Sequence, residues 1–534
     1  MSAFSHLVTT ALAVVFLNIL LTLQNVWPTL WVRPTAEISI EIAIIILLIA
    51  AVVEIRGALN PALRKTIIAA LLLLVVGRYA DITAPALFGR PVDLFWDAPH
   101  LPRLLEMIVE STPLWRLAAY TIGVVSLTAA LIYAIVRAID MLIAACEQSI
   151  MRRSLGATAI IITGLFGAGL SSTTIATESG FSLPVTPVYV KQAAFLARAT
   201  TADEANVTPL PPSNLKKLNG GDAFLIFFES YGAGAFEEPR MRQTLAMDYV
   251  SLEAFLDQSG WRAASAFVDS PTFGGASWLA HSTTLSGRWI NREADYRSFL
   301  ANPTETLVDR FRQAGYRTVL LLPGIKFDWP EGQALRFDSI LDGPALGYTG
   351  PKFGWWEVPD QYSLESLHRR EFIRPNRQPL FVTFASIMSH MPFGPTPPYQ
   401  PDWPRMTTTT PFDPAPLEAA LKTLPDWNDM TAGYLRTIQY DIELLQGFLE
   451  NRAGKDAFVI VSGDHQPPAI ISGKDASWSV PVHIFTQDPA VLEQFVSIGF
   501  RPGMHPARPA LTRMDKFNHM ILEALDSGTE QVSR

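Results

Sequence analysis

The chain has 534 residues, of which 49% are hydrophobic and 17% charged, and its mean hydropathy is +0.20. This is too apolar for an ordinary soluble enzyme of this length, and it excludes disorder over most of the sequence. Acidic residues outnumber basic ones, 50 to 42, so no basic surface indicates nucleic acid as a partner. The single cysteine, Cys146, excludes an intrachain disulfide and a cysteine-rich zinc site.

Hydrophobic residues are concentrated before residue 177, where five segments approach the roughly 20 apolar residues that a membrane-spanning helix needs. The first segment lacks the basic start of a signal peptide, and four more follow it, so we expect an uncleaved helix. The sequence therefore predicts a transmembrane domain over residues 1–177, with spans near 7–23, 38–53, 66–86, 115–136 and 155–176.

Basic residues in the short loops predict the orientation of these spans, because cytoplasmic loops are enriched in Lys and Arg. The richest loops lie between the second and third spans and between the fourth and fifth, and they carry Arg56, Arg64, Lys65, Arg137, Arg152 and Arg153. Placing them inside gives a cytoplasmic N-terminus. An odd number of spans then places everything after residue 177 outside.

Residues 178–220 are rich in Pro, Thr and Ala, and they predict a linker with one juxtamembrane helix near 188–200. Beyond it, short β-rich runs alternate with helical stretches. This pattern predicts an extracytoplasmic α/β domain over 221–534, with a largely parallel sheet flanked by helices on both faces. The expected strands are 223–228, 318–322, 380–385, 458–461 and 480–485, and the expected helices are 241–258, 304–313, 431–450 and 514–525.

Polar side chains directly follow two of the expected strands, where sites collect in open α/β sheets. Glu229 follows the first strand and is either a ligand for a divalent cation or part of a turn. Asp464 and His465 follow strand 458–461 after a Ser-Gly pair. Together they offer one oxygen and one nitrogen donor, a pairing that suits manganese or zinc better than magnesium or calcium.

A third polar cluster begins at Gly274-Gly275-Ala276-Ser277. The glycines allow close approach of a ligand, and Ser277 is either a helix N-cap or a nucleophile activated by a neighbouring metal. His281 lies one helical turn later and His390 just past strand 380–385; each is a candidate to stabilise charge on a transferred group or to assist proton transfer. Packing within the helix is the alternative for His281.

The order of these motifs, Phe-Phe-Glu-Ser-Tyr-Gly, Gly-Gly-Ala-Ser, His-Met-Pro-Phe and Gly-Asp-His-Gln, resembles the alkaline phosphatase and sulfatase superfamily. More narrowly, it resembles the membrane-anchored branch of lipoteichoic acid synthases and phosphoglycerol or phosphoethanolamine transferases. The resemblance implies one divalent metal, typically manganese, with magnesium or zinc as alternatives. It also implies that Glu229, Ser277, Asp464 and His465 bind this metal, that Ser277 is the catalytic nucleophile, and that His390 contacts the substrate, with His281 as a second candidate for that contact.

Two differences from the motifs of related families narrow the function that the resemblance implies. Positions 279 and 281 are Leu and His, where formylglycine sulfatases carry Pro and Arg, and the exported part lacks the cysteines of phosphoethanolamine transferases. We therefore expect transfer of a phosphoglycerol-type headgroup from a membrane phospholipid to an extracytoplasmic glycan or polymer acceptor, with release of diacylglycerol, at the bacterial cytoplasmic membrane. The alternatives are a membrane-bound phosphodiesterase or sulfatase-like hydrolase and, outside catalysis, a sensor or scaffold.

Overall fold

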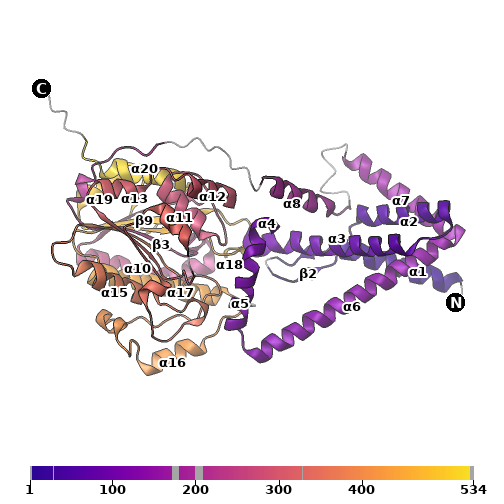
Figure 1. Ribbon diagram of the computed structural model, residues 1–534, viewed down its shortest axis with the longest axis horizontal. Helices are drawn as coiled ribbons and strands as arrows, with labels where there is room; N and C mark the ends of the chain where they lie inside the picture. Colours follow the sequence, from indigo (N-terminus) through magenta and orange to yellow (C-terminus); the bar gives the residue numbers. More distant parts are fainter. Residues whose placement is uncertain are drawn as a thin grey trace. The chain divides into compact units, whose positions relative to one another are not determined.

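The structure is a computed structural model that describes residues 3–27, 29–170, 180–198, 209–327, 329–427 and 429–528. The chain divides into two compact units, one formed by Met1–Leu105 with Thr112–Arg198 and the other by Ala199–Arg534 with Glu106–Ser111. Figure 1 labels the elements of both units.

The first unit is helical. Its helices are α1 (Ala3–Thr22), α2 (Ile40–Arg56), α3 (Pro61–Phe88), α4 (Leu94–Asp97), α6 (Leu114–Glu147), α7 (Ser149–Leu170) and α8 (Thr186–Arg198), together with the first half of α5 (Leu101–Ser111), whose second half is assigned to the other unit. The described parts of the five predicted spans lie largely on helices, and α8 overlaps the predicted juxtamembrane helix over residues 188–198. A two-stranded ribbon of β1 (Gln24–Asn25) and β2 (Val32–Arg33) joins α1 to α2.

Three of these helices are long and apolar enough to cross a membrane: α1, α3 and α6. The prediction of five spans is therefore only partly confirmed. Helix α2 has 17 residues, and at 1.5 Å per residue it is about 26 Å long, slightly less than a hydrocarbon core of about 30 Å. Helix α7 carries Arg152 and Arg153 near its start, and residues 171–176 of the predicted fifth span lie outside the described part of the chain.

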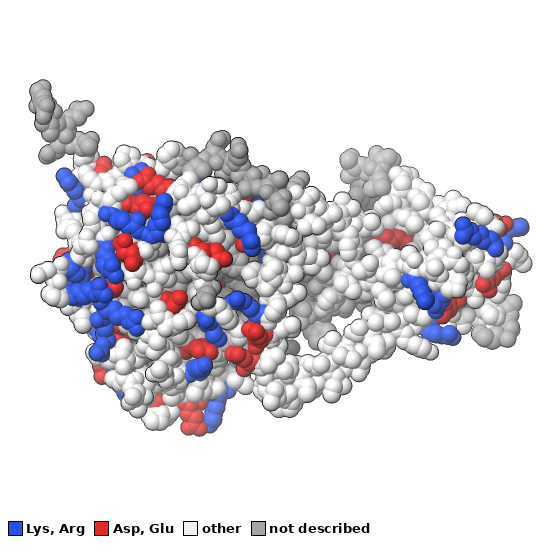
Figure 2. Space-filling model, viewed as in Figure 1, with Lys and Arg blue, Asp and Glu red and all other residues white. Residues whose placement is uncertain are grey.

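Large apolar side chains cover much of the surface of these helices. On α6, Ile122, Val124 and Leu127 are 68%, 63% and 71% exposed. Figure 2 shows that charged residues follow the opposite distribution. Lys, Arg, Asp and Glu are spread over the second unit, whereas the first unit has long uncharged stretches. Such a surface suits a lipid environment, since large exposed apolar patches are rare on soluble monomers.

The second unit is built on a nine-stranded mixed sheet. Its strands are β3 (Ala223–Phe228), β4 (Arg262–Asp269), β5 (Arg317–Leu322), β6 (Ser339–Asp342), β7 (Leu380–Ala385), β8 (Phe458–Gly463), β9 (Ser479–Thr486), β10 (Arg501–Pro502) and β11 (Thr512–Arg513). They run in the order β10-β4-β9-β8-β3-β7-β5-β6, with β11 beside β4. All five predicted strands are present, at the centre of the sheet.

Helices cover both faces of this sheet (Figure 1). The helices of this unit are α9 (Gly234–Glu237), α10 (Pro239–Ser259), α11 (Ser277–Ser286), α12 (Glu293–Ala301), α13 (Leu307–Gln313), α14 (Gly343–Leu346), α15 (Asp360–Leu367), α16 (Pro414–Lys422), α17 (Thr431–Asn451), α18 (Ala469–Ser472), α19 (Pro489–Ser497) and α20 (Met514–Leu525). Strand β3 shows why both faces of the sheet need a cover of helices. Successive side chains of a strand point to opposite faces, and apolar side chains of β3 point to both. Phe224, Ile226 and Phe228 join the core beneath α10, α15 and α17. Ala223, Leu225 and Phe227 join the core beneath α11, α13, α19 and α20.

The sheet departs from the predicted parallel arrangement at one side. Strands β8, β3, β7, β5 and β6 are parallel to their neighbours in that series, whereas β9 runs antiparallel to both β8 and β4. Only the four-residue helix α18 lies between β8 and β9. This connection is too short for a crossover, so the chain folds back beside the strand it has just left.

Candidate metal and nucleophile site

Two segments that are far apart in the sequence meet at the carboxyl ends of two neighbouring strands. Strand β3 ends directly before Glu229, and its neighbour β8 ends directly before Asp464 and His465. A Cβ on Gly463 would lie 1.8 Å from the carbonyl oxygen of Tyr231, so glycine is what lets these two strand ends approach. Glu229, Asp464 and His465 are all buried, at 4%, 0% and 1% exposure.

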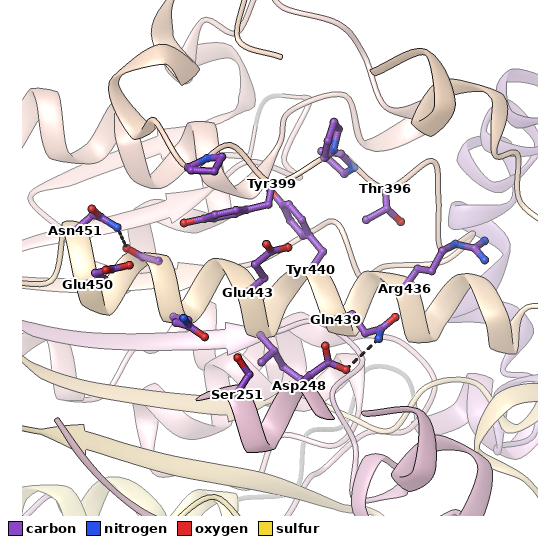
Figure 3. A pocket seen from close by; sticks show the side chains of 16 residues that line it. Asp248, Ser251, Thr396, Tyr399, Arg436, Gln439, Tyr440, Glu443, Glu450 and Asn451 are labelled. Carbon is purple, nitrogen blue, oxygen red and sulfur yellow. Dashed lines mark hydrogen bonds between the residues drawn. The ribbon is translucent and has the colours of Figure 1, made fainter. Parts of the chain in front are cut away.

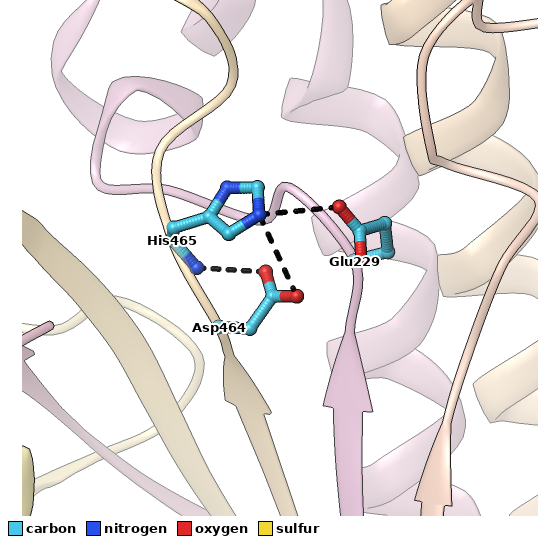
Figure 4. Close-up of side chains that lie close together, drawn as sticks. All are labelled: Glu229, Asp464 and His465. Carbon is cyan, nitrogen blue, oxygen red and sulfur yellow. Dashed lines mark hydrogen bonds and ion pairs between the residues drawn. The ribbon is translucent and has the colours of Figure 1, made fainter. Parts of the chain in front are cut away.

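These three side chains converge on one point (Figure 4). Each offers one ligand atom, and these atoms all lie within 4.8 Å of one another. The Nε2 atom of His465 is 3.2 Å from Oε1 of Glu229 and 3.8 Å from Oδ2 of Asp464. A mixed set of carboxylate oxygens and an imidazole nitrogen at this spacing fits a divalent cation such as manganese or zinc.

Ser277 adds a hydroxyl to this cluster from the first residue of α11. Its Oγ donates a hydrogen bond of 2.8 Å to Oε2 of Glu229 and lies 3.0 Å from Nε2 of His465. The preceding turn is sharp, because Gly274 and Ala276 both have positive φ angles, 68° and 61°. A left-handed conformation at a residue with a Cβ costs about 1 kcal/mol or more, and such residues concentrate at functional sites.

The hydrogen bonds of His465 determine which nitrogen faces the cluster. Its Nδ1 lies 2.8 Å from the carbonyl oxygen of Gln466, and a carbonyl can only accept, so Nδ1 carries hydrogen. Nε2 is therefore the nitrogen available to a cation, with its ring orientation fixed from behind. Burial opposes a charge on His465, but the negative charges of Asp464 and Glu229 outweigh it and raise its pKa to about 9.

Asp464 is held through one oxygen and leaves the other free. Its Oδ1 accepts hydrogen bonds from the backbone N–H groups of Ser230 and His465, at 2.9 Å and 2.7 Å. Its Oδ2 is buried and has no hydrogen-bond partner. An orphaned carboxylate oxygen costs roughly 1–3 kcal/mol or more, so this atom supports the assignment of a cation site.

His281 and His390 both lie beside the cluster. The Nε2 atom of His281 is 3.7 Å from Oδ2 of Asp464, and its ring packs on that of Phe227 with centroids 4.4 Å apart. The Nδ1 atom of His390 donates to the carbonyl oxygen of Met391 at 2.7 Å, which leaves Nε2 available to another group. Burial opposes ionisation of Glu229, but the charges of His390 and His465 hold its pKa well below its usual range.

Three serines that support the cluster were missed by sequence reasoning. Ser230 donates to Oε1 of Glu229 at 3.1 Å, Ser386 accepts from the Glu229 backbone N–H at 3.0 Å, and Ser270 donates to the Asp464 carbonyl at 2.6 Å. Ser386 directly follows β7, so its place after a buried strand was a usable signal. The other two were hidden among ordinary turn residues.

Two buried carboxyl groups behind the cluster also gave no signal in the sequence. Asp360 accepts hydrogen bonds from the backbone N–H groups of Ile387 and Met388, in the segment that leads to His390. Burial raises the pKa of Asp360 to about 7, and the charge of Glu229 adds to that shift. Asp441 is fully buried with no partner for either oxygen, and burial followed by repulsion from Asp360 raises its pKa well above the usual range.

A separate groove lies along the outer face of α17 (Figure 3). Its volume is about 810 Å³. Helix α17 lines it with Arg436, Gln439, Glu443, Gln446 and Glu450, and the opposite walls come from Asp248 of α10 and from Thr396 and Tyr399 of the segment that follows His390. The groove residues of α17 recur every three or four positions, as expected for one face of a helix. None of its lining residues belongs to the Glu229, Asp464 and His465 cluster.

Residues 272–479 match the protein family described as Sulfatase. The matched region includes Ser277, His390, Asp464 and His465, whereas Glu229 lies before it. The resemblance to the alkaline phosphatase and sulfatase superfamily is confirmed by this match.

Solved structures similar to this chain include three of bacterial origin. The lipoteichoic acid synthase LtaP from Listeria monocytogenes is 13% identical over 54% of this chain and 70% of its own, with a TM-score of 0.34. The phosphoglycerol transferase GacH from Streptococcus pyogenes, in complex with sn-glycerol-1-phosphate, is 12% identical over 59% and 78%, with a TM-score of 0.36. The C-terminal periplasmic domain of EcEptC from Escherichia coli is 13% identical over 53% and 74%, with a TM-score of 0.32. A comparison with curated proteins gives no match.

Proposed function

We propose that this chain, which carries a sulfatase-family region, is a membrane-anchored, metal-dependent transferase. Its substrate is a phospholipid with a phosphoglycerol-type headgroup, and its acceptor is an extracytoplasmic glycan or polymer. The observation that carries the proposal is the position of the Ser277 hydroxyl, which lies within 3.0 Å of both Glu229 and His465. A hydroxyl so placed, beside buried groups suited to a divalent cation, is a candidate nucleophile.

The residues that would hold the metal are Glu229, Ser277, Asp464 and His465. A bound divalent ion would lower the pKa of the Ser277 hydroxyl and withdraw charge from the phosphoryl oxygens. Manganese is our first choice because the set combines two carboxylates with one imidazole, and zinc and magnesium are the alternatives. His390, with Nε2 free, contacts the phosphoryl group in this proposal.

The transfer has two steps. Ser277 Oγ forms a bond to the phosphorus of the donor, the bond between phosphorus and the diacylglycerol oxygen breaks, and diacylglycerol leaves after taking up the proton that Ser277 gives up. A hydroxyl of the acceptor then forms the new bond to phosphorus, and its proton returns to Ser277 as the serine ester breaks. Water in place of the acceptor gives hydrolysis, which is the alternative function.

The helical unit supports the choice of a lipid donor. In the described part of the chain, three helices are long and apolar enough to cross a membrane. A catalytic unit tethered to the bilayer meets lipid headgroups at a high effective concentration. We propose a cytoplasmic N-terminus and a catalytic unit outside the bacterial cytoplasmic membrane. This orientation rests on five spans, because only then do the loops with Arg56, Arg64, Lys65, Arg152 and Arg153 lie on the cytoplasmic side.

The groove along α17 supports an extended acceptor. From Arg436 to Glu450 it follows 14 residues of helix, which is about 21 Å. Its lining combines amides and carboxylates with the Tyr399 ring, and three acidic residues there (Asp248, Glu443 and Glu450) face one basic residue, Arg436. This balance disfavours a polyanionic chain and suits an uncharged, hydroxyl-rich polymer.

Product analysis tests the proposed function. The detergent-purified full chain is incubated with Mn²⁺ and mixed bacterial phospholipids, with and without a glycan acceptor, and diacylglycerol and water-soluble products are followed by mass spectrometry. We expect diacylglycerol release that is lost in Ser277→Ala and kept in Ser497→Ala, a change at an exposed serine on α19. A headgroup adduct on the acceptor establishes transfer, free headgroup phosphate without an adduct favours hydrolysis, and product formation by Ser277→Ala contradicts the proposal.

A further inference from the structure

His281 has a buried nitrogen without a hydrogen-bond partner, and this nitrogen lies beside the unpartnered oxygen of Asp464. The Nε2 atom of His281 is buried without a hydrogen-bond partner, and so is Oδ2 of Asp464. These two atoms are 3.7 Å apart, which exceeds the 2.7–3.2 Å of a direct hydrogen bond to nitrogen. Burying a polar atom without a hydrogen-bond partner costs free energy. The pair therefore indicates that a bound ion or molecule contacts both atoms.

We infer that His281 is a further ligand of the metal that the proposed function requires, rather than a contact for the substrate. Two atoms bound to one ion at about 2.0–2.2 Å each lie at most about 4.4 Å apart, and the 3.7 Å between Asp464 Oδ2 and His281 Nε2 satisfies that limit for this pair. A cation accepts lone pairs from both Oδ2 and Nε2. The inference rests on the proposed metal-dependent function, but it concerns the binding of the ion and not the transfer step.

The position of His281 on α11 explains how one helix can reach the ion twice. Ser277 and His281 are four residues apart on α11, which places them on the same helix face. The Phe227 ring packs against the imidazole of His281 and restricts its orientation. Helix α11 would therefore supply two ligands, Ser277 and His281, while the ends of β3 and β8 supply the other three.

This arrangement also distinguishes His281 from His390. His390 has its Nδ1 bonded to the Met391 carbonyl and its ring beside that of Trp356, with centroids 4.3 Å apart. Its free nitrogen is not paired with an orphaned carboxylate oxygen in the described residues. The two histidines therefore have different roles, with His281 binding the ion and His390 facing the substrate.

Mn²⁺ binding without any substrate tests the inference. The full chain in detergent is loaded with Mn²⁺, and electron spin echo spectroscopy counts the histidine nitrogens coupled to the ion, while titration gives its affinity. We expect two coupled histidines in the wild type, one in His281→Ala, and an affinity at least about tenfold weaker in that variant. His505→Ala, a change at an exposed histidine, serves as the matched control and should alter neither quantity.

Other outcomes overturn the inference. One coupled histidine in the wild type, or an unchanged affinity in His281→Ala, would mean that a water fills the gap or that His281 contacts the substrate. The wild-type count needs no variant, so it decides the question even if His281→Ala fails to fold. Absence of Mn²⁺ binding also rejects it, whereas two coupled histidines without headgroup transfer would reject the proposed function alone.

Discussion

The two units of the chain place their apolar and polar side chains in opposite ways. On α6 of the first unit, Ile122, Val124 and Leu127 face outward, between 63% and 71% exposed. In the second unit the apolar residues fill two cores on either side of the sheet, and buried polar groups gather at the ends of β3 and β8. The location of the apolar residues therefore differs between the units. An apolar surface suits contact with lipid, whereas an apolar core with a charged surface suits water and allows a buried polar site.

Loss of one cluster carboxylate should have the largest effect. Asp464→Asn keeps the shape of the side chain but removes a charge whose Oδ2 has no protein partner. We expect Mn²⁺ affinity to fall by at least about a hundredfold and transfer to fall to the background rate, because a charged ligand is lost. Isothermal titration and diacylglycerol release measure the two effects, with the exposed Asp475→Asn as control. Retention of metal binding by Asp464→Asn would contradict the site.

A charge placed on the exposed apolar surface of α6 should have the next largest effect. Leu127 on α6 and Met247 on α10 are almost equally exposed, at 71% and 72%. Arginine near the centre of a membrane helix costs about 2.5–3.5 kcal/mol on insertion scales, whereas exposed arginine on a soluble domain is nearly neutral. We therefore expect Leu127→Arg, but not Met247→Arg, to reduce the amount of membrane-extracted protein. Equal yields of the two variants would break the comparison between the units.

The groove along α17, proposed above to bind the acceptor, predicts a smaller and more selective change. Glu443→Ala removes one hydrogen-bonding group from the exposed face of α17. We expect the acceptor KM to rise about fivefold, which corresponds to about 1 kcal/mol for one hydrogen bond. Diacylglycerol release by hydrolysis should not change, since the groove is separate from the cluster. Glu493→Ala on α19, also exposed, is the control, and an unchanged acceptor KM in Glu443→Ala would argue against this groove.

The buried Asp441 predicts a pH-dependent change in stability. Its pKa is raised in the folded state by burial and by Asp360, so above its unfolded pKa of about 3.9 the folded state holds a proton that the unfolded state has lost. The free energy of unfolding therefore falls as pH rises. Asp441→Asn removes the carboxyl group that must take up a proton on folding. The variant should therefore melt about 2–4 °C above the wild type at pH 8, with no gain at pH 4. A gain that is equal at both pH values would exclude this explanation.

Much of this architecture was predictable because burial leaves a clear pattern. The central strands β3, β7 and β8 are short apolar runs, and they appeared where expected. Strand β4 was missed because its Arg-Ala-Ala-Ser-Ala-Phe-Val-Asp sequence is mostly small residues. The antiparallel direction of β9 depends on the length of one connection rather than on the strand itself.

The candidate site was predictable to the extent that its residues follow strands or glycine turns. Glu229, Asp464, His465 and Ser277 do so, and the structure brings them together. Asp360 comes from α15 and acts on a segment about 27 residues away in the sequence, so only the tertiary fold reveals it. The lack of hydrogen-bond partners at Asp464 Oδ2 and His281 Nε2 likewise becomes visible only in the folded structure.

The most direct test of the central claim is mass spectrometry of the peptide that contains Ser277. The full chain is incubated with Mn²⁺ and the donor lipid in the absence of acceptor, quenched in acid and digested. We predict a peptide heavier by one headgroup phosphoryl unit, with the added mass on Ser277, and its disappearance when acceptor is supplied. Diacylglycerol release without any adduct on Ser277, or with an adduct on another residue, would contradict the account.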